Sequence, residues 1–208
     1  MSAQADRGGW TAIRPFVAGA VVLAVAMGIG RFAYTPAIVV MRRDGGLTVA
    51  FAGILASTNL AGYLLGALLA MHPFARTHRV AAVRIGTIAV VVTTAMMALP
   101  SQPLWLVARF LTGVASGIVF VLTASLLLDR AAATSSRYGV AIVFSGVGIG
   151  IAAAGVFVPA FAALGGSHAA WLGAAAVSAI ALAIALPMLP SGTARAAITA
   201  RSSALRGN

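Results

Sequence analysis

The sequence contains no cysteine, no lysine and no glutamate, and its acidic residues are Asp6, Asp44 and Asp129. The absence of cysteine excludes disulfide bonds and cysteine-ligated metal sites. Charged residues make up 8% of the 208 residues, against about 25% in soluble domains. So few polar side chains could not cover a soluble domain, and the 61% hydrophobic content excludes a disordered chain. The composition therefore predicts an integral membrane protein.

The fourteen basic residues are all arginine and give a formal net charge of +11. A positive net charge of this size also occurs in nucleic-acid-binding proteins. Here the arginines do not gather on one face and the apolar content is too high for that class. We expect no nucleic-acid partner, and loops that face the cytoplasm and anionic lipid headgroups.

Six apolar stretches are long enough to cross a lipid bilayer as helices. They are rich in alanine and leucine and lack the strict alternation of barrel strands. The sequence thus predicts an all-α polytopic membrane protein, with a cytoplasmic segment at 1–15, a six-helix bundle at 16–190 and an arginine-rich cytoplasmic tail at 191–208. The predicted spans are 16–41, 47–71, 80–99, 104–128, 138–164 and 169–189.

The first span has an alternative interpretation as a cleaved signal peptide, because Arg7 and Arg14 precede its apolar run. The run lacks a convincing small-x-small cleavage site, and hydrophobicity resumes after Arg31. We therefore favour a transmembrane helix.

The distribution of arginine predicts the orientation in the inner membrane, because cytoplasmic loops are enriched in basic residues. With both termini in the cytoplasm, ten arginines lie on the inner side and only Arg42 and Arg43 on the outer side. The remaining two, Arg31 and Arg109, lie within spans.

An ionisable residue within a span is costly and indicates a functional site. At about 1.5 Å per residue, Arg31 lies about 15 Å and Arg109 about 8 Å from the outer ends of their spans. No acidic residue lies in any span to pair with them. Two arginines in a water-filled cavity would attract an anion, whereas the alternative is that each extends to the outer headgroups.

Other polar residues belong to the same candidate substrate site. Tyr34 lies in the first span between Gly30 and Pro36, residues that favour a discontinuous helix. Asn59 and Tyr63 share a face of the second span, where they could bond a solute or another helix.

Pairs of glycines four residues apart predict close helix packing. No span carries paired acids, a histidine pair or a serine–histidine arrangement, so we expect no enzyme, no metal site and no cofactor. The residues assigned to packing or gating are Gly28, Gly30, Pro36, Gly62, Gly66, Gly113, Gly117, Gly146 and Gly150.

The chain resembles the N-terminal half of a major facilitator superfamily (MFS) transporter, in its YbfB/YjiJ-like branch. The resemblance rests on the stretch 28–36, on Asn59 with 62–66, and on six helices with both termini inside. It implies alternating access, with the first, second, fourth and fifth helices lining a cavity. Arg109, Gly113 and Gly117 match the fourth-helix motif, whose arginine is linked with proton or substrate coupling.

Other motifs of the superfamily are matched only in part. Gly146, Gly150 and Gly155 resemble the fifth-helix motif of exporters, without its Gly-Pro pair. The acidic position in the loop after the second helix falls on Ala70. The residues expected to form a substitute cytoplasmic charge cluster are Arg76, Arg79 and Asp129.

MFS transporters normally have twelve helices in two halves. The chain is accordingly expected to be half of a split or truncated protein, a cropped piece, or a subunit that recreates the second half by dimerising. Its expected partners are the lipid bilayer, a small anionic or polar solute, and a second six-helix half or a second copy. The alternative function is a non-transporting scaffold whose glycine faces bind other helices.

Overall fold

The structure, a computed structural model, describes residues 2–45 and 47–189, the first ten of them by backbone alone, so the predicted tail at 191–208 lies outside the described residues. The described chain is helical and has no strand. The elements are α1 (Ser2–Leu23), the π-helix η1 (Ala24–Ile29), α2 (Gly30–Phe32), α3 (Tyr34–Arg43), α4 (Val49–Ala70), α5 (Pro73–Thr77), α6 (Arg79–Met96), α7 (Gln102–Ala133), α8 (Gly139–Ala185) and the 3₁₀ turn η2 (Leu186–Met188).

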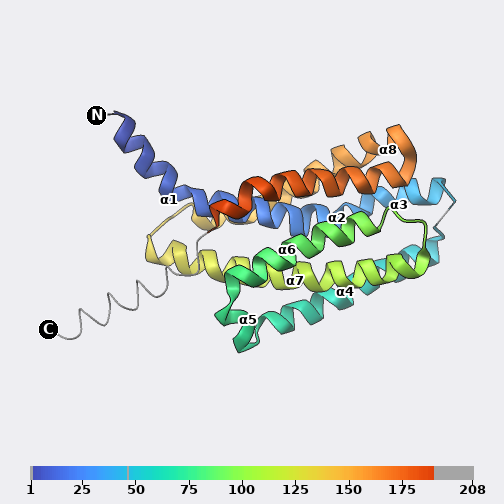
Figure 1. Cartoon of the computed structure of the whole chain (residues 1–208), viewed down its shortest axis with the longest axis horizontal. Coiled ribbons are helices and arrows are strands. Elements are labelled where there is room, and N and C mark those ends of the chain that lie inside the picture. The colour runs from blue at the N-terminus through green and yellow to red at the C-terminus, as the bar shows by residue number, and fades with distance from the viewer. Residues whose placement is uncertain (1, 46, 190–208) are drawn as a thin grey trace.

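These elements make six crossings, as the sequence predicts. Helix 1, the segment formed by α1, η1, α2 and α3, crosses once, and α4, α6 and α7 cross once each. The 47 residues of α8 would measure about 70 Å if straight, which is more than twice the hydrocarbon core. Non-helical backbone at Gly165 and Gly166 divides α8 into two legs. Figure 1 shows these legs folded back against each other.

The bundle is held by close contacts between particular helices. The most extensive contacts are those between α4 and α7, between α6 and α7, and between helix 1 and α8 (Figure 1). Buried apolar side chains such as Leu55, Val90, Val119 and Trp171 fill the spaces between them. The start of α1 and the end of α8 lie at the same end of the bundle, which we call the terminal end. We call the opposite end, with the turn of α8, the turn end.

The helix bounds differ from the predicted spans where polar residues continue a helix beyond the end of its apolar run. The fourth span is predicted to end at Leu128, yet α7 continues to Ala133, because the exposed Asp129 and the half-buried Arg130 do not break the helix. The short helix α5 lies in a predicted loop. It begins with proline at its first position, and the His72 side chain accepts a hydrogen bond from the Phe74 N–H.

A hydrogen bond between two loops closes the turn end. The Asp44 carboxylate, after helix 1, accepts a hydrogen bond from the Ser167 N–H at 2.7 Å. Gly166 next to it has a φ of +64°, a conformation that favours glycine. Hydrogen bonding to the Ser167 side chain, together with this backbone bond, stabilises the ionised form of the carboxyl, so the pKa of Asp44 is lowered from its ordinary value of 3.8.

This bond predicts an acid-sensitive contribution to stability. Because the pKa of Asp44 is lower in the folded protein, the contribution is present above the ordinary value of 3.8 and is lost as pH falls through the folded-state pKa. Thermal unfolding in micelles from about pH 6 to about pH 2.5 should therefore show a smaller loss of stability for Asp44→Asn than for the unmodified chain. Equal losses in the two proteins would contradict this role of Asp44.

Candidate functional site

Helix 1 changes its winding in the middle of the bundle. In η1 the backbone forms a wider π turn, and the Gly30 N–H donates to the Val25 carbonyl, five residues back. The helix is interrupted again at Ala33, three residues before Pro36, which has no N–H to donate. Such local departures from α-helix are frequent at functional sites. Arg31 and Tyr34 lie on either side of the second interruption.

The glycine pairs of α4 and α7 bring these two helices into backbone contact. A Cβ at Gly62 would overlap the Phe110 carbonyl, and one at Gly113 would overlap the Asn59 carbonyl. This close approach leaves room for a hydrogen bond between the helices. The buried Asn59 amide donates to the Arg109 carbonyl at 2.8 Å.

Arg109 lies inside the bundle and contacts the interrupted part of helix 1. Its side chain is 2% exposed. The guanidinium donates to the Gly30 carbonyl at 3.2 Å and, more weakly, to the Arg31 carbonyl at 3.5 Å. It also lies 4.5 Å from the centre of the Tyr34 ring, whose hydroxyl donates to the Ala52 carbonyl of α4. Arg109 thus connects α7 to helix 1 through neutral partners.

Arg31 extends in a different direction and remains half-buried. Its guanidinium lies 4.3 Å from the centre of the Tyr63 ring on α4 and 5.7 Å from that of Phe32. Among the described residues, no carboxylate pairs with Arg31 and no acceptor takes a hydrogen bond from its guanidinium. A cation stacked on an aromatic face keeps its N–H edge available for an anion.

The five residues predicted for the substrate site therefore lie in one connected group. Arg31 stacks on Tyr63, Arg109 lies over Tyr34 and donates to the backbone at Arg31, and Asn59 donates to Arg109. They differ in accessibility, because Tyr34, Asn59 and Arg109 are buried whereas Arg31 and Tyr63 are half-buried.

Helix 1 is also held by glycines of α8. A Cβ at Gly146 would overlap the Ala20 carbonyl, and one at Gly150 would overlap the Ala24 carbonyl. Gly28 in turn lies against the backbone of Gly150. The π turn is thus pressed against the first leg of α8.

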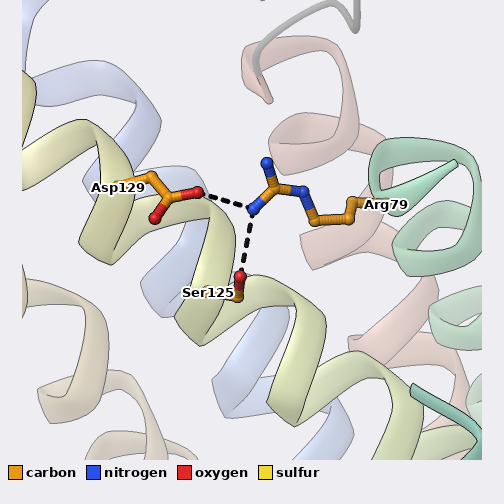
Figure 2. Close-up of polar contacts among 3 residues, drawn as sticks. All are labelled: Arg79, Ser125 and Asp129. Atoms are coloured by element: carbon orange, nitrogen blue, oxygen red, sulfur yellow. Dashed lines mark hydrogen bonds and ion pairs between the residues drawn. The ribbon is translucent and has the colours of Figure 1, made fainter. Parts of the chain in front are cut away.

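At the terminal end, one ion pair connects α6 to α7. Arg79 donates to the Asp129 carboxylate at 2.7 Å and to the Ser125 hydroxyl at 3.0 Å (Figure 2). Arg76 of the predicted charge cluster lies on α5, is exposed, and is not part of this ion pair. Ser125 was not predicted. Its place one helical turn before Asp129 is the signal that could have identified it.

A pocket of about 260 Å³ lies at the turn end. Met41, Asp44, Trp105 and His168 contribute to its wall. None of the five predicted substrate-site residues lines it. The group around Arg31 is thus separate from this pocket.

Comparison with known proteins identifies the family of the chain. Residues 23–206 match the model of a family described as uncharacterised MFS-type transporter YbfB. No curated protein and no solved structure gives a match. The match covers most of the chain and includes helix 1 from Leu23 onward, the other five crossings and the group around Arg31. The chain therefore belongs to the YbfB-like family of MFS transporters.

Proposed function

We propose that this MFS-type protein moves a small anionic or polar solute across the inner membrane by alternating access, with Arg31 as its anion contact. The observation that carries the proposal is the half-buried Arg31 guanidinium, which lies within a span and has no counter-ion among the described residues. Placing arginine at mid-membrane costs roughly 2.5–3.5 kcal/mol on insertion scales. A solute anion would offset part of this cost.

The other residues of the group have different roles in this proposal. Tyr63 orients the Arg31 guanidinium by stacking, and its hydroxyl contacts the solute. Arg109, Tyr34 and Asn59 are enclosed and hold the interrupted helix 1 against α4 and α7. Motion of the bundle against a second six-helix half or a second copy would alternate access to Arg31. Both termini face the cytoplasm, in agreement with the positive-inside distribution.

The test is solute flux in proteoliposomes that contain the 208-residue chain. A panel of labelled carboxylates and neutral polar solutes is compared for the unmodified chain and Arg31→Gln. We expect the flux of the accepted solute to fall by about tenfold or more in Arg31→Gln, because a charge-assisted hydrogen bond contributes roughly 1.5–3 kcal/mol.

Arg42→Gln is the matched control, since Arg42 is exposed at the end of the same helix. It should transport normally. Flux that persists unchanged in Arg31→Gln, or that falls equally in Arg42→Gln, would contradict the assignment of Arg31.

A further inference from the structure

Three aromatic rings form a row that begins at the Arg31 guanidinium. The ring centres of Tyr63 and Phe120 are 6.5 Å apart, and those of Phe120 and Phe144 are 6.0 Å apart at an edge-to-face angle of 70°. The rings belong to three helices, α4, α7 and α8, and Arg31 joins them from helix 1. We call Tyr63, Phe120 and Phe144 the aromatic row.

The aromatic row is open along its length. Tyr63 and Phe120 are half-buried, and 37% of Phe144 is exposed. Next to Phe144, nothing lies within 4 Å of the position that a Cβ would occupy at Gly148, one helical turn along α8. The rings therefore pack on one another and still leave apolar surface that a further ring could cover.

The charge along the row favours a monovalent anion. Arg31 is the half-buried cation at one end of the row, whereas the Arg109 guanidinium is enclosed by helix 1. The described carboxylates lie elsewhere, with Asp44 bonded to Ser167 and Asp129 bonded to Arg79. A cationic solute would be repelled by Arg31, and a dianion would bring a second negative charge for which this face offers no partner.

We propose that the solute is an aryl-alkyl monocarboxylate, whose carboxylate binds Arg31 and whose ring packs on Phe120 and Phe144. The inference rests on the proposed function and names the substrate class of the same site. The guanidinium already covers a face of Tyr63, so the ring of the solute lies one or two rings further along the row. The proposed solute thus carries a phenyl group separated from its carboxylate by a short linker.

The experiment measures binding of labelled phenylacetate to the 208-residue chain in lipid nanodiscs, with empty nanodiscs subtracted. Acetate, cyclohexylacetate and 2-phenylethylamine are the competitors. We expect acetate to compete at least about tenfold less well than phenylacetate, since burying a ring adds roughly 1.5–3 kcal/mol. Cyclohexylacetate should be about threefold weaker, because it lacks the edge-to-face contact, and 2-phenylethylamine should not compete.

Two variants test the two ends of the site. Arg31→Gln should weaken phenylacetate binding about tenfold or more. Phe144→Ala should weaken phenylacetate about three- to tenfold and leave acetate unchanged. Phe74→Ala is the control, because Phe74 is an exposed ring on α5 that lies outside the aromatic row.

Each outcome separates this inference from the proposed function. If acetate binds as tightly as phenylacetate and both depend on Arg31, the aromatic class is wrong and the anion site stands. Equal effects of Phe144→Ala and Phe74→Ala would also overturn the aromatic row. If phenylacetate binds without dependence on Arg31, the substrate class and the anion contact are both wrong. If phenylacetate shows no saturable binding, the inference is overturned, and the transport panel then decides the proposed function.

Discussion

Replacing Gly146 with alanine should destabilise the bundle strongly, although it adds one methyl group. The new Cβ would overlap the carbonyl oxygen of Ala20 and the backbone beside it, and backbone cannot rotate away as a flexible side chain can. Overpacking of this kind costs about 1–3 kcal/mol, and we expect the upper end because α1 and α8 must separate. The measurement is the free energy of unfolding in micelles by denaturant titration.

Gly148→Ala is a closely matched control for this prediction. The residue lies two positions further on the same helix, the substitution is identical, and nothing lies within 4 Å of the new Cβ. We expect it to keep or slightly raise the free energy of unfolding, by up to about 1 kcal/mol, because alanine favours helix over glycine. If both variants lost the same free energy, backbone contact at Gly146 would not be the cause.

Replacing Arg109 with methionine should abolish most transport while changing stability little. The unmodified chain bears the cost of a buried arginine, roughly 2.5–3.5 kcal/mol. The variant loses two hydrogen bonds to carbonyls of helix 1, which are worth on average about 0.6 kcal/mol each within membranes. It also loses the contact with the Tyr34 ring, worth up to about 2 kcal/mol when desolvated. These terms nearly cancel, so the free energy of unfolding should stay within about 1.5 kcal/mol of the unmodified value.

Transport should nevertheless fall about tenfold or more in Arg109→Met, because misplacement of a contact by about 1 Å is sufficient for large losses of function. Without Arg109, no guanidinium connects α7 to the carbonyls of Gly30 and Arg31. Arg109→Lys separates charge from geometry, since an ammonium keeps the charge without the planar fork. We expect it to fold and to transport poorly. A loss of stability above about 3 kcal/mol in Arg109→Met would indicate that Arg109 serves folding first.

The crossings were predictable because a bilayer requires long apolar helices, and the predicted break at 165–168 contains the turn of α8. Helix ends were harder to predict, since hydropathy marks where a chain leaves the membrane and not where the helix stops. Polar residues therefore continue α7 beyond Leu128. The π turn at η1 has no sequence pattern comparable to a cap, although Gly28 and Gly30 indicate an irregular helix there.

The members of the candidate site were predictable from their cost in the membrane, but their contacts were not. Arg31 and Arg109 are each a charge within a span, yet only the packing shows that one is enclosed and the other half-open. The aromatic row was not predicted from the sequence. Phe120 and Phe144 are ordinary apolar residues of two spans, and only the helix arrangement brings their rings together.

The π turn of helix 1 changes which side of the helix faces which neighbour. Each residue of an α-helix advances about 100° around the axis, so the extra residue of a π turn shifts everything after it by about that angle. The leg before the turn presents Ala20 to α8, and the leg after it presents Arg31 to α4. With uniform α-helical winding, the Arg31 guanidinium would point well away from Tyr63. The widened turn thus sets the direction in which the half-buried Arg31 guanidinium leaves helix 1.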